Sequence, residues 1–274
     1  MTSRIWFITG ASRGLGLAWA QAALERGDKV VAAVRSTDSM AALKRRFGDA
    51  IVPIGVDVGS RAAVFDAVGM AMAKFGRIDV LVSNAGYGLF GTIEETDETQ
   101  ARAQFDVNLF GTLWVVQAAL PHLRRQGSGH IIVTSSIAGI VTFPTAGVYN
   151  ATKWAVEGLI ETLASEIADF GIRVTLVEPG GYDTDWRGDS ASHTTPMPQY
   201  DALRQAMKAA GASRKLGDPA ATAKAILAVA DTAEPPLRLI LGNVGLPAAR
   251  KAYEQRLKTW DAWASISEQA QGSA

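Results

Sequence analysis

Tyr149 and Lys153 lie four residues apart in the segment YNATK, and Ser136 precedes Tyr149 by thirteen residues. On a helix, positions i and i+4 share one face, so a phenol and an ammonium group at this spacing can reach one small cleft. A nearby cation favours the phenolate and lowers the pKa of a tyrosine toward the range where general acid–base catalysis is efficient. Ser136 ends the run HIIVTSS, where a strand is expected to end and a hydroxyl can hold a substrate oxygen. The spacing predicts proton transfer, although a lone YxxxK also occurs by chance on amphipathic helices.

A glycine-rich turn near the N-terminus is the second chemical feature. An apolar run at 5–8 is followed by Gly10, Gly14 and Gly16 and by a helical pattern over about 15–25. Positions without side chains at a helix N-terminus let a pyrophosphate approach the backbone N–H groups and the positive end of the helix dipole. The spacing is GxxxGxG rather than the GxGxxG of the commonest dinucleotide fingerprint. The turn predicts a nucleotide phosphate site, and glycines that only shape a tight turn are the alternative.

Eight separate pieces of the chain resemble the short-chain dehydrogenase/reductase family in their order and spacing. They are TGASRGLG at 9–16, Asp57, NAG at 84–86, Asn108, Ser136, Tyr149, Lys153 and PG at 179–180. The resemblance runs from about residue 3 to residue 184 and is weaker beyond. Ser83 replaces the Asn that more often precedes NAG, which is a small departure. The segments NAGYGLFG and VEPGGYDTDW resemble the hydroxysteroid/retinol dehydrogenase-like branch.

The resemblance implies an α/β fold: a single doubly wound Rossmann-type domain over residues 1–274, with a parallel sheet of about seven strands and helices on both faces. Short β-branched runs that alternate with longer helical patterns agree with such a sheet. After the first strand, these runs occur at 29–34, 51–54, 78–82, 130–134, 172–177 and 237–241. No Pro/Gly/Ser-rich linker divides the chain. A small lid is expected after the sixth strand, over 185–214, and an amphipathic C-terminal helix over 247–264.

The family resemblance also implies the roles of four residues. Tyr149 is expected to exchange a proton with the substrate oxygen, Ser136 to hydrogen-bond that oxygen, and Lys153 to bind the nicotinamide ribose and lower the pKa of the tyrosine. Asn108 is expected to hold a water that relays the proton. The alternative for Asn108 is a helix-kinking residue whose amide bonds to backbone. Ser135 competes with Ser136, but the thirteen-residue separation from Tyr149 selects the second serine.

An arginine after the second strand favours NADP(H) as the cofactor. Dinucleotide folds that prefer NAD place Asp or Glu there to bind the ribose 2′-hydroxyl, whereas this chain has Arg35. Arg35 can clamp a 2′-phosphate, and Arg13 in the glycine turn can reach that phosphate from the other side. NAD(H) remains the alternative cofactor. In that case Arg35 is a solvated loop residue and Arg13 is a packing feature of the turn. The expected cofactor-binding residues are Gly10, Ser12, Arg13, Gly14, Leu15, Gly16, Arg35, Asp57, Val58, Asn84, Ala85, Gly86, Tyr149, Lys153, Pro179, Gly180 and Thr184.

The residues expected to recognise the substrate lie largely in the part of the chain with the weakest hydrophobic pattern. Residues 185–214 show little core periodicity, and long irregular segments in compact domains often act as lids. Apolar side chains around the expected cleft predict a bulky apolar ketone or alcohol, with steroids, retinoids, terpenoids and polyketides all open. The residues expected to touch the substrate are Tyr87, Ile137, Phe143, Tyr182 and Trp186, and ordinary core packing is the alternative for each.

Amino-acid composition limits the expected binding partners and the expected cellular location of the protein. Lys plus Arg equal Asp plus Glu at 27 each, which argues against nucleic acid and anionic membranes as partners. The chain has no cysteine and only three histidines, so no metal site is expected. No apolar stretch is long enough to span a bilayer, and no signal peptide is expected before the first strand, which favours a cytoplasmic location. The resemblance implies a homodimer or homotetramer, formed through helices near 101–125 and 148–169.

Three functions of different classes fit these features. The first is an NADP-dependent carbonyl reductase or alcohol dehydrogenase, the second a catalytically weak NADP-binding sensor on the same fold, and the third a sugar-nucleotide epimerase or dehydratase. The complete set of Ser136, Tyr149 and Lys153 argues against a sensor. Only about 90 residues follow the PG turn, too few for the substrate domain that the third class usually carries.

Overall fold

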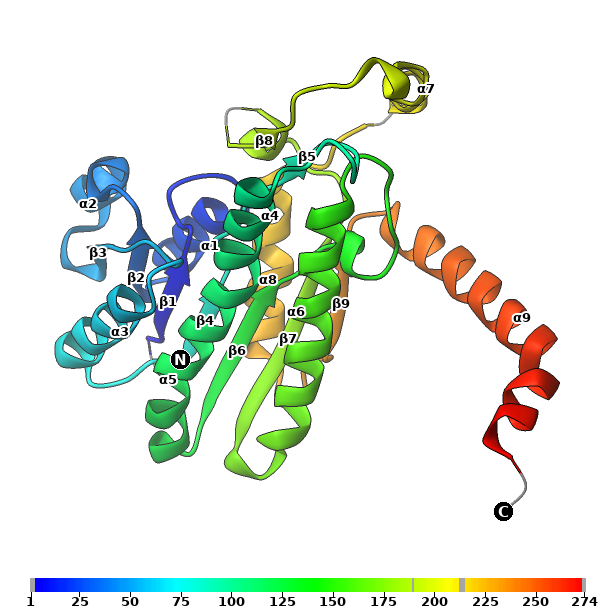
Figure 1. Cartoon of the computed structure of the whole chain (residues 1–274). Helices are drawn as coiled ribbons and strands as arrows, with labels where there is room; N and C mark the ends of the chain where they lie inside the picture. The colour runs from blue at the N-terminus through cyan, green and yellow to red at the C-terminus, as the bar shows by residue number, and fades with distance from the viewer. Residues whose placement is uncertain (1–2, 189, 212–214, 273–274) are drawn as a thin grey trace.

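A seven-stranded parallel sheet forms the centre of the molecule (Figure 1). The structure is a computed structural model that describes residues 3–188, 190–211 and 215–272. The strands are β1 (Ile5–Thr9), β2 (Lys29–Val34), β3 (Ile51–Gly55), β4 (Val80–Ser83), β6 (Gly129–Thr134), β7 (Ile172–Pro179) and β9 (Arg238–Leu241). Their order is β3-β2-β1-β4-β6-β7-β9, so the winding direction reverses between β1 and β4. The predicted doubly wound domain is confirmed.

Helices cover both faces of this sheet (Figure 1). One face carries α3 (Arg61–Phe75), α5 (Gly111–Gln126) and α6 (Gly147–Glu166). The other face carries α1 (Gly14–Glu25), α2 (Ala41–Phe47) and α8 (Thr222–Asp231). Each βα unit therefore crosses over one face before the next parallel strand begins, because parallel strands need a crossover connection.

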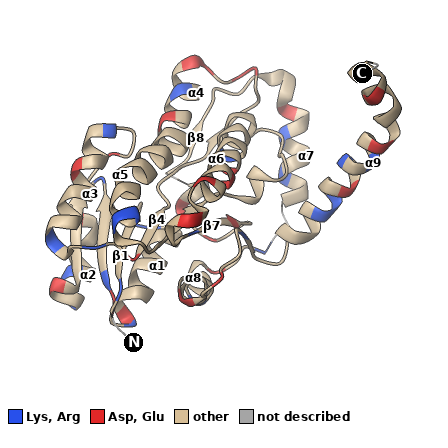
Figure 2. Ribbon diagram, turned by 90° about the horizontal axis from the view of Figure 1, so that it is seen from below, with Lys and Arg blue, Asp and Glu red and all other residues tan. Residues whose placement is uncertain are grey.

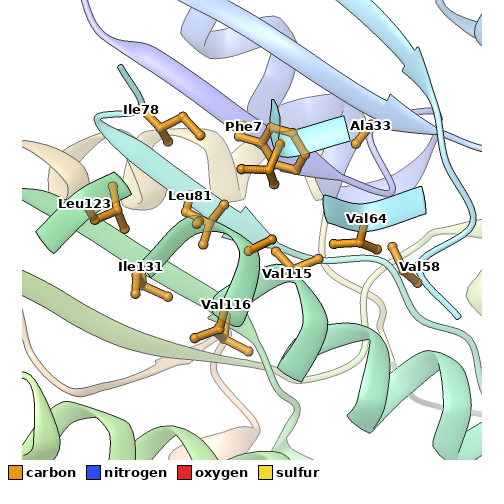
Figure 3. Close-up of a cluster of buried hydrophobic side chains, with 14 of the residues drawn as sticks. Phe7, Ala33, Val58, Val64, Ile78, Leu81, Val115, Val116, Leu123 and Ile131 are labelled. Carbon is orange, nitrogen blue, oxygen red and sulfur yellow. The ribbon is translucent and has the colours of Figure 1, made fainter. Parts of the chain in front are cut away.

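The core lies on both faces because successive strand side chains point to opposite sides of a sheet. In β1, Phe7 packs beneath α3 and α5, whereas Trp6 and Ile8 pack against the α1 side. Figure 3 shows Phe7 near Val64 and Val115, which come from α3 and α5. Strands that are buried on both faces form a rigid platform, and their carboxyl ends meet at one edge.

Four loops leave that carboxyl edge close to the reversal point. They are the glycine turn at 10–13 after β1, the NAG turn at 84–86 after β4, residues 135–139 after β6 and residues 180–188 after β7. Ligands of doubly wound sheets bind in the crevice at such a reversal. The predicted site residues come mainly from these loops and from the start of α6.

The segment predicted as an irregular lid, 185–214, contains regular structure. Its strand β8 (Ser192–His193) pairs with β5 (Leu89–Phe90), and α7 (Asp201–Gly211) follows. The prediction missed α7, although the apolar side chains of this helix gather on one face; none of its side chains is buried. Residues 189 and 212–214 of the predicted lid lie outside the described residues.

The C-terminal helix α9 spans Gly245–Gln271 and is longer than the predicted 247–264. Its first turns pack on the body, whereas the rest extends away from it (Figure 1). Among the helices of the described residues, none combines the length and the apolar character needed to cross a bilayer.

Candidate active site

Tyr149 and Lys153 lie one turn apart near the start of α6, and each is only 6% exposed. The Lys153 ammonium donates a hydrogen bond to the Thr134 carbonyl at the end of β6, at 2.9 Å. It lies 5.9 Å from the centre of the Tyr149 ring. Burial lowers the pKa of Lys153 to about 8, and the Glu157 carboxyl one turn further along α6 opposes this shift. The predicted pair thus shares one buried face of the helix, as the i,i+4 spacing requires.

Ser136 caps the short helical turn Ile137–Gly139, which lies in the loop after β6 at the same edge of the sheet. Its Oγ accepts a hydrogen bond from the Ala138 backbone N–H at 3.1 Å, which holds the hydroxyl in place. Ser135 lies elsewhere: a Cβ added to Gly139 would meet both the Ser135 hydroxyl and the Glu157 side chain within 3 Å. The buried Ser135 is therefore packed toward α6, and the choice of Ser136 over Ser135 stays a prediction.

Asn108 lies in a π-helical turn, Asp106–Phe110, between α4 (Glu98–Phe105) and α5. Its side chain holds the backbone of Tyr87, because Oδ1 accepts from the Tyr87 N–H at 3.1 Å and Nδ2 donates to the Tyr87 carbonyl at 3.0 Å. Single π-turns inside helices occur frequently at functional sites. These hydrogen bonds to backbone agree with the alternative interpretation of Asn108. The proton-relay water stays a prediction.

Gly86 lies between Asn108 and Lys153. A Cβ at Gly86 would be 3.0 Å from Asn108 Oδ1 and 3.9 Å from Lys153 Nζ. The NAG turn, the π-turn and α6 therefore meet at this point, and a Cβ here would require the Asn108 side chain to shift slightly.

The glycine turn forms a cradle at the N-terminus of α1. Gly10 and Gly14 have positive φ angles of 66° and 55°, which residues with a side chain rarely adopt. A Cβ at Gly16 would come within 2.4 Å of the Gly10 carbonyl oxygen, so only glycine fits there. No side chain caps the first turn of α1. Its backbone N–H groups are thus available to an anion, and the cradle fits a pyrophosphate.

A chain of hydrogen bonds links this cradle to Lys153. The Asn84 amide donates to the carbonyls of Thr9 at 3.1 Å and Gly10 at 3.3 Å. Asn84 Oδ1 accepts from the Thr134 hydroxyl at 3.1 Å, and the Thr134 carbonyl accepts from Lys153. The predicted phosphate site and the predicted proton-transfer pair are therefore parts of one connected structure.

The two arginines predicted to bind a 2′-phosphate have different surroundings. Arg35 directly follows β2 and is exposed. Arg13 forms an ion pair with Asp185 at 3.0 Å, which ties the glycine turn to the segment after β7. Thr184 lies beside this pair, and its methyl group would be 3.5 Å from a Cβ at Gly14.

Other predicted cofactor residues divide into surface and core positions. Asp57 is exposed after β3 and accepts a hydrogen bond from the Gly59 N–H at 3.0 Å. Val58 is buried instead, and a Cβ added to Gly111 would contact its side chain. Asp57 is therefore exposed and Val58 packs in the core, and a role of either residue in cofactor binding stays a prediction.

The predicted substrate residues do not form one cluster. Trp186 and Phe143 pack against Tyr149 in a small apolar cluster at the carboxyl edge. Ile137 belongs to a neighbouring cluster with the first turns of α9, and Phe143 contacts both clusters. Tyr182 packs instead against the core on the α1 and α8 side. Trp186 and Phe143 are thus near the candidate acid, whereas Ile137 and Tyr182 lie in other clusters.

Two unpredicted glycines let the segment after β7 close over the site. A Cβ at Gly88 would lie 2.8 Å from the indole ring of Trp186, and one at Gly91 would lie 2.0 Å from the Thr194 hydroxyl. Both glycines stand in NAGYGLFG, so their positions in the sequence were visible, but their contacts are about 100 residues away along the chain.

Glu95 anchors the same segment and was also not predicted. Its carboxylate accepts hydrogen bonds from the backbone N–H groups of Met197 at 2.7 Å and Thr92 at 2.8 Å and from Arg204 at 2.6 Å. These donors, with the Met197 N–H first, lower the pKa of Glu95 to about 2. No local sequence signal marks this role, because Met197 is 102 residues away.

Comparisons with known proteins agree with the geometry. A family model described as short chain dehydrogenase matches residues 4–195. Oxidoreductase BOA17 of Botryotinia fuckeliana is 41% identical over 271 residues, which cover 97% of this chain and 98% of that protein. The crystal structure of a short-chain dehydrogenase from Streptomyces avermitilis is 35% identical, with a TM-score of 0.92 over 98% of this chain and 99% of its own.

Two further similar structures contain a nicotinamide cofactor. An alcohol dehydrogenase from Thermococcus sibiricus, complexed with 5-hydroxy-NADP, is 28% identical with a TM-score of 0.73, covering 89% of this chain and 98% of its own. A short chain dehydrogenase/reductase from Burkholderia phymatum, in complex with NAD, is 26% identical with a TM-score of 0.81, covering 94% and 95%. Similar proteins therefore bind either form of the cofactor.

Proposed function

The chain belongs to the short-chain dehydrogenase family, and we propose that it is an NADP(H)-dependent oxidoreductase that interconverts a carbonyl and a secondary alcohol on a bulky apolar substrate. One observation carries the proposal: Tyr149 and Lys153 share a buried face of α6, at the edge where the glycine cradle opens. The hydrogen bonds through Asn84 and Thr134 support it, because they join the cradle to Lys153.

The cradle and its neighbours would hold the cofactor. The α1 N-terminus would bind the pyrophosphate through backbone N–H groups, and Lys153 would bind the nicotinamide ribose. When bound, the nicotinamide would supply a hydride to the carbonyl carbon or take one from the alcohol carbon.

The proton transfer belongs to side chains of the chain itself. In the reducing direction, the Tyr149 hydroxyl donates its proton to the carbonyl oxygen, which becomes the alcohol oxygen, and the reverse reaction returns the proton to the phenolate. Ser136 donates a hydrogen bond to the same oxygen. Below pH of about 8 the Lys153 ammonium is charged, and a nearby cation stabilises the phenolate that forms when the proton leaves.

The preference for NADP(H) rests on Arg35. This side chain is exposed directly after β2, where NAD-preferring folds carry an acidic residue. A guanidinium there can form charge-assisted hydrogen bonds with a 2′-phosphate. Arg13 adds to this only when it leaves its ion pair with Asp185.

The substrate class rests on the apolar surroundings of Tyr149. Ala138, Ala146, Phe143 and Trp186 pack around its ring, and Phe90 adds an edge contact to Trp186. A bulky apolar ketone would replace contacts that these rings now make with one another, whereas a small charged substrate would leave them exposed to water.

The proposal is tested by NADPH oxidation with a panel of bulky apolar and small polar ketones. Tyr149→Phe should lower kcat at least ~100-fold on every ketone that is reduced. Its NADPH affinity, measured by nicotinamide fluorescence, should stay within about threefold of the wild type. Tyr253→Phe, which removes the hydroxyl of an exposed tyrosine on α9, is the matched control and should keep full activity. Equal rates for Tyr149→Phe and the wild type would disprove the acid assignment.

The competing sensor function makes a different prediction for the same panel. A catalytically weak sensor would bind NADPH tightly but reduce none of the ketones. The presence of all three residues, Ser136, Tyr149 and Lys153, favours the enzyme.

A further inference from the structure

Two buried carboxyl groups lie close to the candidate proton-transfer pair. Glu157 follows Lys153 by one turn on α6, and its side chain is 8% exposed. Glu178 comes from the end of β7, and its side chain is 1% exposed. Figure 2 marks acidic residues on both α6 and β7, two elements that pack together. Two carboxylates that share one buried site do not both ionise readily, so their surroundings decide which of them carries the charge.

Arg238 on β9 favours the ionised form of Glu157. Its Nε donates a hydrogen bond to Glu157 Oε2 at 3.0 Å, whereas Glu178 Oε1 lies 3.5 Å from the same nitrogen. Among the described residues, none donates a hydrogen bond to either carboxyl oxygen of Glu178. Hydrogen bonds to a carboxylate favour its charged form, so Glu157 carries the charge of the pair and Glu178 holds the proton.

The pKa shifts of the two carboxyl groups agree with this division. Burial raises the pKa of Glu157. The Ser135 hydroxyl, Arg238 and Lys153 each oppose that increase. Burial also raises the pKa of Glu178, to about 8, with a further increase from Glu157 and an opposing effect from Arg238. Three groups thus favour the ionised form of Glu157, against one for Glu178.

Glu157 and the Lys153 ammonium occupy the same buried space at the end of β6. The ammonium donates to the Thr134 carbonyl at 2.9 Å. The hydroxyl of the next residue, Ser135, would lie 2.9 Å from a Cβ on Gly139, and the Glu157 side chain 2.8 Å from it. On a helix the Cβ atoms of an i,i+4 pair are roughly 5–6 Å apart. A buried anion therefore lies one turn from the buried cation.

We propose that Glu157 is a positioning residue that keeps Lys153 charged. Arg238 holds Glu157 in its ionised form, and Glu178 takes the single proton of the two carboxyl groups. The catalytic consequence rests on the proposed function, in which the Lys153 cation assists the loss of the Tyr149 proton. The charged and titratable groups around Glu157 come from α6, β7 and β9, and they are Lys153, Glu161, Glu178 and Arg238.

NMR titration of Lys153 tests the proposal without an activity measurement. In the full chain with ¹³C-labelled lysine, the Cε signal that disappears in Lys153→Arg reports the pKa of Lys153, followed from about pH 6 to 11. Glu157→Gln keeps the shape of the side chain but removes its charge, so the titration midpoint should fall by roughly one pH unit. Glu161→Gln is the control, because Glu161 is exposed and pairs with the same Arg238. A midpoint unchanged in Glu157→Gln, or lowered equally in Glu161→Gln, overturns the proposal.

Arg238→Gln gives a second test, in which the proposal predicts an unusual sign. Removal of a cation near a lysine ordinarily raises the pKa of that lysine, because repulsion between like charges is lost. Here the Lys153 midpoint should fall instead, because Glu157 loses its ion pair and takes up a proton. A midpoint that rises or stays the same in Arg238→Gln contradicts the proposal.

The pH dependence of kcat separates this inference from the proposed function. With a ketone that is reduced, kcat of Glu157→Gln should decline at lower pH than kcat of the wild type. KM for the ketone should stay within about threefold, since Glu157 lies behind Lys153 on α6 and a change confined to the proton-transfer step leaves substrate binding intact. A lower Lys153 midpoint with an unchanged kcat profile would support the role of Glu157 and contradict the proposed role of the Lys153 charge in the reaction. An unchanged midpoint overturns the role of Glu157 whatever the activity.

Discussion

The indole of Trp186 and the phenol of Tyr149 are ring neighbours, with centroids 5.0 Å apart and planes tilted by 59°. Trp186 comes from the segment after β7 and Tyr149 from α6, so the contact joins two parts of the chain that lie 37 residues apart in sequence. Phe90 meets the same indole edge-on at 5.1 Å. The aromatic rings of Trp186 and Phe90 therefore form one side of the surroundings of the candidate acid.

Trp186→Ala should raise KM for aromatic or polycyclic ketones about 5- to 50-fold, because a buried aromatic contact worth ~1–2 kcal/mol is lost. The value of kcat should change less than threefold, since the proton-transfer groups stay in place. Trp186→Phe should restore most of the affinity. Trp154→Ala, on the outer side of α6, is the control and should leave KM unchanged. A KM unaffected by Trp186→Ala would exclude the indole from the substrate site.

Arg35→Ala should weaken NADPH binding about 10- to 100-fold and leave NADH binding unchanged, because a hydrogen bond to a charged group is worth roughly 1.5–3 kcal/mol. Titration by nicotinamide fluorescence measures both affinities. Arg45→Ala removes another exposed arginine, on α2, and should change neither affinity. If Arg35→Ala bound NADPH like the wild type, the 2′-phosphate assignment would be wrong.

Asp185→Asn should strengthen NADPH binding by roughly two- to fivefold. The substitution removes the charge that pairs with Arg13 at 3.0 Å, and exposed ion pairs of this kind are worth about 0.2–1 kcal/mol. Arg13 would then be available to the 2′-phosphate, so NADH affinity should stay constant. Asp183→Asn, at a nearby exposed position, is the control. Equal gains for NADH and NADPH would show that Arg13 does not discriminate between the cofactors.

Glu95→Gln should loosen the segment 194–204. The carboxylate receives the Met197 N–H and the Arg204 guanidinium, and its pKa of about 2 keeps it ionised throughout the working pH range. Hydrogen exchange followed by mass spectrometry should show faster exchange in this segment and unchanged exchange in β1. Glu98→Gln, which affects only an exposed pair with Arg102, is the control. Unchanged exchange in Glu95→Gln would mean that other contacts hold the segment.

Glu178 should make the protein less stable as pH rises from about 5 to 8. This side chain on β7 is completely buried, and burial raises its pKa to about 8, with a further increase from Glu157 and an opposing effect from Arg238. The folded state therefore holds a proton that the unfolded state releases near its ordinary pKa, so the free energy of unfolding falls by at most ~1.4 kcal/mol per pH unit.

Glu178→Gln keeps a neutral side chain of the same shape and should remove this part of the pH dependence. Urea unfolding at several pH values between about 5 and 8 measures the difference from the wild type, which should change steadily with pH. Glu161→Gln is the control, because Glu161 is exposed and pairs with the same Arg238. A difference between Glu178→Gln and the wild type that is independent of pH would mean that Glu178 is ionised in the folded protein.

Local patterns in the sequence were sufficient to predict the doubly wound fold and the shared helix face of Tyr149 and Lys153. The alternation along β2 places Val31 on one face of the sheet and Val30 on the other, and the i,i+4 spacing puts Tyr149 and Lys153 on one face of α6. The glycine turn was equally predictable from the sequence, because positive φ angles and the close approach of other backbone atoms allow few residues besides glycine. Each of these features depends on neighbours within about ten residues.

Tertiary structure alone decided what surrounds these groups. The ion pair of Arg13 with Asp185, the anchoring of 194–204 by Glu95 and the indole beside Tyr149 join residues far apart along the chain. The sequence predicted the carboxyl-edge segments but not their partners, because periodicity records which side of an element is buried and not what buries it. The length and exposure of α9 were likewise set beyond its own pattern, since a stripe of apolar side chains looks the same whether it meets the body of the protein or leaves it.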